Sequence, residues 1–186
     1  GWKELQKLLG EKFSSSTVTP ILASTINSPN LTDLGNAKRL VRAFQHELLY
    51  CANYGSWFVY DGLRWKRDTD GAVFRRAKQT IGTIFAEAAA ESDPNRRADL
   101  HKHAPRSESQ RAIQAMVALA ATEQDIAIES YRLDSDPWLL NVQNGTLDLK
   151  TGTLQDHDRT DFITMLSPIQ YLPTATCSNW DSFLNY

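Results

Sequence analysis

Three residues in the last third of the chain have types and spacing that could support metal-dependent chemistry. Asp136 precedes a predicted β-hairpin, and Asp148 and Lys150 lie on it as an Asp-x-Lys pair. Two carboxylates could hold Mg²⁺, while the lysine would stabilise the attacking hydroxide or the charge that develops on phosphorus. A metal-dependent nuclease using Asp136, Asp148 and Lys150 is therefore one hypothesis for this chain.

A structural hairpin is the competing interpretation of the same residues. The Asp-Pro order at 136–137 is the reverse of the Pro-Asp order in that class of nuclease. Asp148 also alternates with Leu147 and Leu149, so it faces away from them as a solvent-exposed strand residue would. Both observations favour a turn and a strand, and we predict no metal site.

Cations in the middle of the chain form a larger group of candidate binding residues. Residues 64–106 carry ten Lys and Arg against six Asp and Glu, a net charge of +4, whereas residues 123–161 carry three against nine, a net charge of −6. The positive part could contact DNA phosphates, or it could pack against the negative part of a neighbouring copy in a ring. A solvated surface is the third possibility. The candidate DNA-binding residues are Arg64, Lys66, Arg67, Arg75, Arg76, Lys78, Arg96, Arg97 and Trp57.

Other catalytic motifs are absent from the sequence. It contains no phosphate-binding loop GxxxxGK[ST], no GxGxxG and no GxSxG. His101 and His103 form an i, i+2 pair without further Cys or carboxylate ligands, so we interpret them as solvated loop residues. Cys51 and Cys177 lack the spacing of metal ligands. We therefore expect no cofactor in this chain and no catalysis by the chain itself.

The composition is typical of a soluble globular protein. Apolar residues make up 41% of the 186 residues and charged residues 23%, and the formal net charge is −2. This charge excludes a global attraction for nucleic acid or anionic membranes, so DNA binding would need a local patch. No run of 18 apolar residues is present and the first residues resemble no signal peptide, so we expect the cytoplasm as location. Because the chain starts at Gly1, we expect a piece of a longer protein.

Hydrophobic periodicity predicts the elements that would position these residues. Residues 1–30 are expected to form an arm or linker, since Ser, Thr and Pro are frequent from Ser14 onward. A first helix follows the N-cap Thr32 and ends near residues 53–55. Its apolar stripe is Leu34, Ala37, Leu40, Val41, Phe44 and Leu48, and its expected solvent face carries Lys38, Arg39 and Arg42.

A β-hairpin is predicted next, with Asp61-Gly62 as a two-residue turn. Tyr60 would then oppose Leu63, and Phe58 would oppose Trp65, on one face. The other face would combine the Trp57 indole with Arg64 and Lys66.

Two more helices and a loop follow the hairpin. The second helix, over residues 72–91, has as its inward residues Val73, Ala77, Ile81, Ile84, Phe85 and Ala88. Residues 92–106 are polar, basic and bounded by prolines, which predicts an exposed loop. Ser107 and Gln110 form a capping box for a third helix, whose inward residues are Ile113, Met116, Val117 and Ala120.

The last third is predicted to be mostly β-structure. Strands are expected at 126–131 and 163–165, and a helix begins at Trp180. Between them lies a meander with reversals at Asn144-Gly145 and Thr151-Gly152, one face of which carries Leu140, Val142, Leu147, Leu149 and Leu154. Without βαβ alternation, these elements predict an α+β fold of about three to four helices packed with β-hairpins or a small antiparallel meander.

Four segments occur here in the order of a known family: LTDLGNAKRLVRAF, GSWFVYDGLRWKRD, LDSDPWLLNVQNGTLDLKTGTLQDH and MLSPIQYLPTATCSNWDSFL. Together, over residues 31–186, they resemble the region immediately preceding the superfamily 3 helicase domain in phage, plasmid and poxvirus primase–helicases. The hairpins at 57–65 and 144–152 carry over as fold-defining elements. No catalytic residue carries over.

This resemblance implies a domain organisation and a function. Residues 31–176 would be an accessory domain, 1–30 the end of a preceding region, and 177–186 the start of the connection to a helicase domain. The domain would assist ring assembly and DNA engagement by the ATPase motor, which would bind the ATP and Mg²⁺ of the whole protein. The expected partners are single-stranded or forked DNA and further copies in a ring, with no membrane. A protein–protein collar without DNA contact is the alternative.

Overall fold

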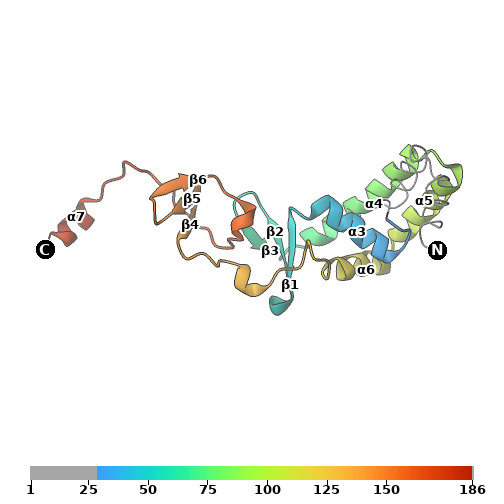
Figure 1. Ribbon diagram of the computed structural model, residues 1–186, viewed down its shortest axis with the longest axis horizontal. Helices are drawn as coiled ribbons and strands as arrows, with labels where there is room; N and C mark the ends of the chain where they lie inside the picture. The colour runs from blue at the N-terminus through green and yellow to red at the C-terminus, as the bar shows by residue number, and fades with distance from the viewer. Residues whose placement is uncertain (1–28, 186) are drawn as a thin grey trace, which may run out of the picture.

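The computed structural model describes residues 29–185 as an elongated molecule with helices at one end and β-structure at the other (Figure 1). The helical lobe comprises α3 (Asp33–Phe44), α4 (Ala72–Ala90), α5 (Pro94–Ser107) and α6 (Gln110–Ala120). Sheet A comprises β1 (Leu48–Cys51), β2 (Ser56–Tyr60) and β3 (Trp65–Arg67), and sheet B comprises β4 (Leu139–Val142), β5 (Gly145–Asp148) and β6 (Thr153–Gln155). The α+β fold expected from the sequence is confirmed. The predictions for residues 1–28 lie outside the described residues.

The core of the helical lobe lies between α3, α4 and α6. Thr32 caps α3 as predicted, since its hydroxyl accepts a hydrogen bond from the Gly35 amide at 3.1 Å. Leu40, Ile81 and Met116 meet in this core and are buried. The predicted bounds and most inward residues of α4 are confirmed, although the Phe85 side chain is 39% exposed.

Helix α3 ends at Phe44, about ten residues earlier than the sequence predicts. The chain then becomes β1, whose alternate side chains enter two different cores. Leu48 lies in the helical core, while Leu49 and Cys51 lie in a second core with Trp65 on the other side of sheet A. Only a strand can bury successive residues on opposite sides in this way, so burial from two sides overrides the continued helical pattern.

Residues 94–107 form helix α5, so the prediction of an exposed loop is wrong. The Asp93 carboxylate accepts a hydrogen bond from the Asn95 amide, and Pro94 occupies the first helical position. Leu100, Ala104 and Ser107 are buried at helical spacing, so one narrow face suffices to dock α5. Ser107 therefore ends α5, and Ser109 rather than Ser107 caps α6.

The β2–β3 hairpin has a four-residue loop instead of the predicted two-residue turn. Tyr60 pairs with Trp65, and Phe58 pairs with Arg67. The Asp61 carboxylate closes the loop by accepting hydrogen bonds from the Leu63 and Arg64 amides. The observed pairing is shifted by two residues from the predicted pairing. Because side chains alternate between the two faces of a strand, a shift of two leaves each side chain on its predicted face.

Sheet B forms the predicted meander, but its first reversal lies one residue earlier. Val142 pairs with Gly145, so the two turn residues are Gln143 and Asn144. Leu140 is 39% exposed and Leu149 is 47% exposed, contrary to the predicted apolar face. Val142 and Leu147 of the predicted apolar face are buried, and on the opposite face the polar residues Asn141 and Thr146 are buried as well.

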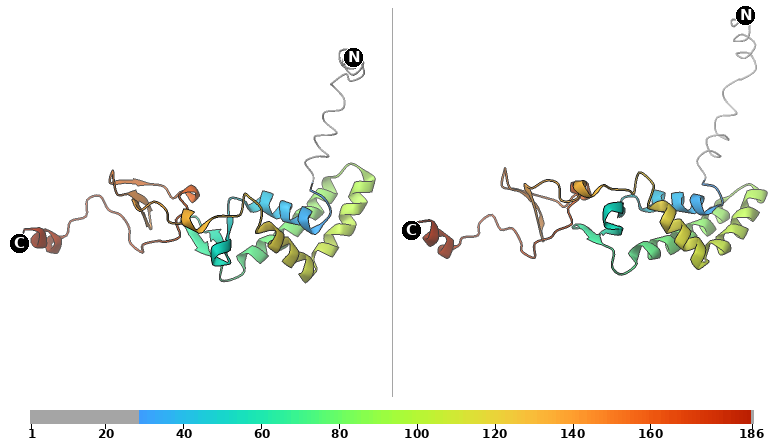
Figure 2. Two further views of the ribbon diagram at one scale, coloured as in Figure 1. Left: turned by 60° about the horizontal axis from the view of Figure 1, so that its bottom comes forward. Right: turned by 90° about the horizontal axis from the view of Figure 1, so that it is seen from below.

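Sheet A lies between the helical lobe and sheet B, as the two views in Figure 2 show. Asn141 in β4 donates hydrogen bonds through Nδ2 to the carbonyl oxygens of Leu63 (2.9 Å) and Met165 (3.1 Å). The Trp65 indole donates to the carbonyl oxygen of Arg159 at 2.8 Å. These bonds attach sheet B and the segment after it to the β2–β3 loop.

Two predicted strands are absent from the described residues. Residues 126–131 make a single parallel bridge between Ala127 and Tyr50, followed by a 3₁₀ turn. Residues 163–165 contact the hairpin through one backbone hydrogen bond, from the Trp65 amide to the Ile163 carbonyl. The chain ends in α7 (Ser178–Leu184), where the sequence predicts a helix.

In the part of the chain that the structure describes, no helix is both long and apolar enough to cross a membrane.

Candidate nucleic-acid interface

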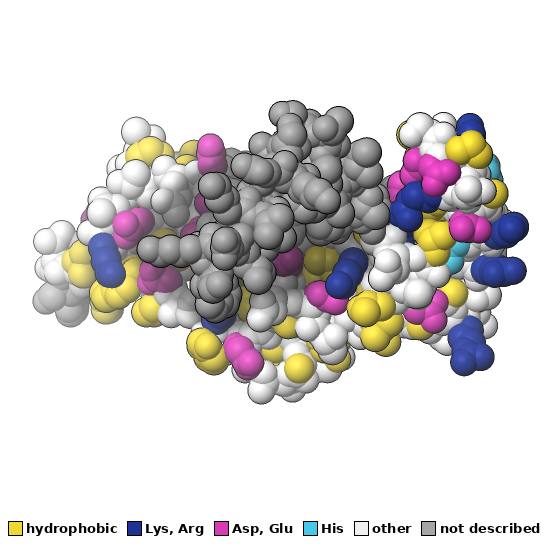
Figure 3. Space-filling view, turned by 45° about the vertical axis from the view of Figure 1, so that its right-hand side comes forward, with side chains coloured by type: hydrophobic (Ala, Val, Ile, Leu, Met, Phe, Trp, Pro, Cys, Tyr) yellow, Lys and Arg dark blue, Asp and Glu magenta, His cyan; other side chains and the backbone are white. Residues whose placement is uncertain are grey.

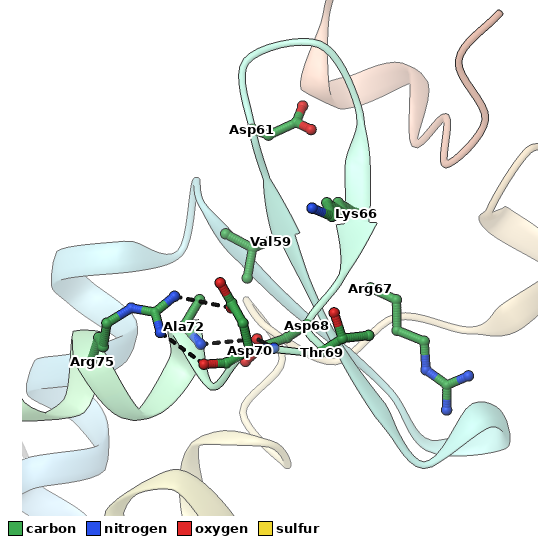
Figure 4. Close-up of a pocket in the computed structure, with 9 residues that line it drawn as sticks. All are labelled: Val59, Asp61, Lys66, Arg67, Asp68, Thr69, Asp70, Ala72 and Arg75. Atoms are coloured by element: carbon green, nitrogen blue, oxygen red, sulfur yellow. Dashed lines mark hydrogen bonds and ion pairs between the residues drawn. The ribbon is translucent and has the colours of Figure 1, made fainter.

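A cleft of about 190 Å³ opens where the β2–β3 hairpin meets the N-terminus of α4 (Figure 4). It is lined by Val59, Asp61, Lys66, Arg67, Asp68, Thr69, Asp70, Ala72 and Arg75. Three of the nine candidate DNA-binding residues, Lys66, Arg67 and Arg75, therefore line one cleft, although residues 68–74 separate the first two from the third in the sequence. The Lys66 ammonium group lies on one side of the hairpin, and the Arg67 guanidinium is directed to the other side (Figure 4).

Asp68 creates this junction by capping α4 directly after β3. Its carboxylate accepts hydrogen bonds from the amides of Ala72 (2.9 Å), Val73 (3.0 Å) and Asp70 (3.3 Å). Burial by itself would raise the pKa of Asp68, but these hydrogen bonds outweigh it and hold the pKa below its usual value. The ionised carboxylate thus satisfies the first amides of α4 and compensates its positive end.

Two candidate arginines at the start of α4 are held in ion pairs. Arg75 binds Asp70 at 2.9 Å, and it also donates to the backbone carbonyl of Asp70 at 2.8 Å (Figure 4). Arg76 binds Glu47 at 2.7 Å and lies over the Phe44 ring at 5.2 Å. Both residues therefore attach the start of α4 to neighbouring segments, which reduces the positive charge that they offer to a ligand.

The remaining candidates are distributed over the molecule. Arg64 is half-buried and donates to the Thr164 carbonyl, and Trp57 packs against Tyr50 beside the helical core. Arg96 pairs with Glu91 at 3.2 Å. Arg97 is exposed on α5, away from the hairpin. The structure thus places Lys66, Arg67 and Arg75 at the cleft. Trp57 lies next to it on β2, where its carbonyl oxygen accepts a hydrogen bond from the Asp68 amide at 2.9 Å, and the other three candidates do not line it.

Lys66, Arg67 and Lys78 are the candidates best placed to meet a polyanion. All three are exposed, and their side chains make no ion pair within residues 29–185. Lys78 lies on α4 one turn beyond Arg75. Exposed cations without a carboxylate partner keep their full charge for phosphate contact.

The three residues of the nuclease hypothesis have structural roles in the meander. The Asp148 carboxylate accepts hydrogen bonds from the Lys150 amide (2.7 Å) and the Thr151 amide (3.3 Å), and the first of these is the main cause of its lowered pKa. The Lys150 ammonium lies over the Trp138 ring at 5.4 Å, and Asp136 accepts from the Trp138 amide. Residues 29–185 contain no group of three or more His, Cys, Asp or Glu that could hold a metal ion.

A buried ion pair in the helical lobe was not foreseen from the sequence. Arg39, predicted on the solvent face of its helix, is 4% exposed and forms an ion pair with Glu87 of α4 at 2.8 Å. Its guanidinium also donates to the carbonyl oxygens of Asn30 (3.0 Å) and Pro29 (3.1 Å). The sequence feature that could have indicated this pair is Glu87, the single acidic residue in the sequence of α4.

His103 is likewise not a solvated loop residue. It lies on α5, half-buried, with Nε2 at 2.9 Å from Asn36 Oδ1 and 3.2 Å from Ser107 Oγ. Asn36 donates in turn through Nδ2 to the Ser107 hydroxyl at 2.9 Å. His101 is exposed as predicted, but it too lies on α5 and not in a loop.

A protein-family model described as "D5 N terminal like" matches residues 37–186 of the chain. The comparison with curated proteins finds no match.

Proposed function

Because the chain belongs to the D5 N-terminal-like family, the N-terminal region of D5-like primase–helicase proteins, we propose that it is a non-catalytic accessory domain that helps the motor of such a protein to engage DNA. The observation that supports DNA engagement is the group of exposed cations around the α4 cleft. Lys66 lines the cleft, and Lys78 lies on α4 one turn beyond Arg75; neither side chain makes an ion pair within residues 29–185. ATP and Mg²⁺ would be bound by the motor, and this domain would supply contacts to the strand.

The distribution of charge supports the same proposal. Lys and Arg side chains gather over the helical end of the molecule (Figure 3), whereas residues 134–161, which contain sheet B, carry six Asp and Glu against two Lys and Arg. A polyanion is therefore attracted to the helical lobe and repelled by the opposite end. This polarity orients a bound strand along the helical lobe.

Fluorescence anisotropy with labelled single-stranded and forked DNA tests this function. We expect binding at about 50 mM salt that weakens steeply with salt, as phosphate contact requires. The double variant Lys66→Ala/Lys78→Ala should reduce the slope of log affinity against log salt by about 1.4, since each single-strand phosphate contact contributes about 0.7.

The matched control is Lys38→Ala, which removes an exposed cation from α3 of the same lobe. It should leave the salt slope unchanged. No binding at low salt, or an equal effect of the control and the double variant, would contradict the proposal.

Ring assembly is the second candidate function, in the form of a collar without DNA contact. It is favoured by the difference in charge between two separate parts of an elongated molecule. The helical lobe carries an excess of Lys and Arg, whereas residues 134–161, which contain sheet B, carry six Asp and Glu against two Lys and Arg, so copies can pack head to tail. Ring assembly of this kind is compatible with DNA engagement, whereas a pure collar excludes DNA contact by this domain.

A further inference from the structure

The outward face of α4 carries two exposed phenylalanines that no described element covers. Phe74 is 41% exposed and Phe85 is 39% exposed, although both lie on the longest helix of a packed lobe. They are about three turns and 16 Å apart along the helix axis and therefore lie on the same side of it. The buried residues of α4, such as Ala77 and Ile84, lie on the side next to them, so the two rings stand at the border between the packed and the exposed side of the helix.

Lys78 and Gly82 lie between the two phenylalanines on this face. Lys78 is exposed, and no heavy atom lies within 4 Å of the position that a Gly82 Cβ would occupy. Ala86 and Ala89 are also exposed and small. A ligand can thus approach the helix backbone closely between the two rings. We call the four residues Phe74, Lys78, Gly82 and Phe85 the α4 stripe.

The α4 stripe has no negative charge close to it on its own helix. Glu87 is the one acidic residue in the sequence of α4, and Arg39 holds its carboxylate on the α3 side at 2.8 Å. Glu91, at the C-cap, is bound by Arg96 at 3.2 Å. A helix face that only faces solvent usually mixes cationic and anionic side chains. Apolar rings, a lysine and no free carboxylate indicate an anionic partner with flat apolar groups.

We propose that the α4 stripe is a stacking track for the bases of single-stranded DNA, with Phe74 and Phe85 as the stacking residues and Lys78 as a phosphate contact between them. Base stacking on aromatic side chains along a positively charged surface is the chemistry by which proteins bind single strands without sequence preference. Duplex DNA cannot bind in this way because its bases stack on one another. This inference rests on the proposed function and adds the form of DNA to it.

The α4 stripe continues into the cleft at the start of the helix. Phe74 is adjacent to Arg75, which lines the cleft together with Lys66. A strand whose bases contact Phe74 and Phe85 therefore has phosphates within reach of cations from the cleft to the middle of α4. Charge complementarity favours this polyanion over a second copy of the chain, because the stripe contains no acid to pair with the basic helical lobe of that copy.

The test compares the affinities of the full chain for single-stranded and duplex DNA of the same length. Phe74→Ala and Phe85→Ala should each weaken single-strand binding by about tenfold, leave duplex binding unchanged and leave the salt slope unchanged. Phe74→Leu and Phe85→Leu keep an apolar side chain for helix packing but remove the ring, and they should show the same loss. Tyr131→Ala removes an exposed ring from the 3₁₀ turn Ser130–Arg132, outside α4, and should have no effect.

A gain-of-signal variant makes the outcome independent of folding defects. Phe74→Trp should preserve affinity, and the added indole fluorescence should be quenched by single-stranded DNA but not by duplex DNA of the same length.

The possible results distinguish failure of the stacking track from failure of the proposed function. Salt-dependent DNA binding that the Phe→Leu variants do not weaken overturns the stacking track and leaves the proposed function standing. Absence of DNA binding at low salt overturns both. Variants that change the molecular mass in solution while preserving affinity per chain would show that the α4 stripe is an interface between copies, which also overturns the inference.

Discussion

At the scale of single residues, the helical lobe depends on polar groups that are buried and fully partnered. Arg39 joins α3 to α4 and to residues 29–30 through one guanidinium. Asn36, His103 and Ser107 join α3 to α5 through a chain of hydrogen bonds. A buried polar group that loses its partner costs about 1–3 kcal/mol, so these residues determine how the helices are placed relative to one another.

The pH dependence of stability should report on His103. Burial, followed by the nearby Arg39, lowers the pKa of His103; Asp33 and Glu87 raise it, and Arg106 lowers it further. Above about pH 6.5 the imidazole is neutral in both the folded and the unfolded chain, so it makes no pH-dependent contribution. Below that pH the unfolded chain binds the proton first, and the free energy of unfolding falls until the folded pKa is reached.

Urea unfolding between pH 7.5 and pH 5 measures this effect. His103→Gln should flatten the decline, because the amide can bond Asn36 without titrating, whereas His101→Gln, at an exposed position, should not. A decline of equal slope in the wild type and in His103→Gln would assign the acid sensitivity to other groups.

At the scale of elements, glycine has opposite roles in sheet B and in α4. Gly145 opens β5 with φ of +150°, and a Cβ at this position would lie 2.4 Å from the Gln155 carbonyl oxygen. Gly82 lies in the helix interior with open space where its Cβ would be. Replacement of glycine by alanine should therefore change the free energy of unfolding in opposite directions at the two positions.

Gly145→Ala should lower the free energy of unfolding by about 1–3 kcal/mol, through backbone strain and displacement of β6. Gly82→Ala should raise it by about 0.5–1 kcal/mol, since alanine reduces the conformational freedom of the unfolded chain. Chemical denaturation of the two variants checks both signs. A stabilising Gly145→Ala would contradict the β5–β6 pairing described above.

At the scale of the whole molecule, charge and shape act together. The helical lobe and sheet B lie at opposite ends of an elongated body (Figure 1). Surface charges that far apart are screened within one molecule, because the Debye length is about 10 Å at 0.1 M salt. The basic surface of the helical lobe can meet the acidic surface around sheet B only when one copy contacts the next.

Head-to-tail association should therefore appear as a salt-dependent increase in mass, measured by light scattering without DNA. We expect assemblies at about 50 mM salt that dissociate at about 0.5 M salt. Glu129→Lys/Asp156→Lys, which reverses two exposed acids, should dissociate them, and adding Arg97→Glu/Lys102→Glu should restore them. Assembly unaffected by salt and by the charge reversals would exclude electrostatic packing.

The sequence by itself determined the start of α3, the whole of α4, the two hairpins and the family. Each depends on signals that are local: the Thr32 cap, a helical stripe across 72–90, and the turn residues near 61–62 and 151–152. Local hydrogen bonds and periodicity are present in the chain before it folds, so they can be predicted from the sequence.

Only the tertiary structure decided which surfaces are buried. The chain leaves the helix for β1 because two separate cores receive Leu48 and Leu49, and Arg39 is buried because Glu87 lies opposite it. Lys66, Arg67 and Arg75 share a cleft because Asp68 turns the chain between β3 and α4. These outcomes depend on contacts between residues distant in the sequence. The free energy of such contacts exceeds the intrinsic preference of a short segment for helix or strand.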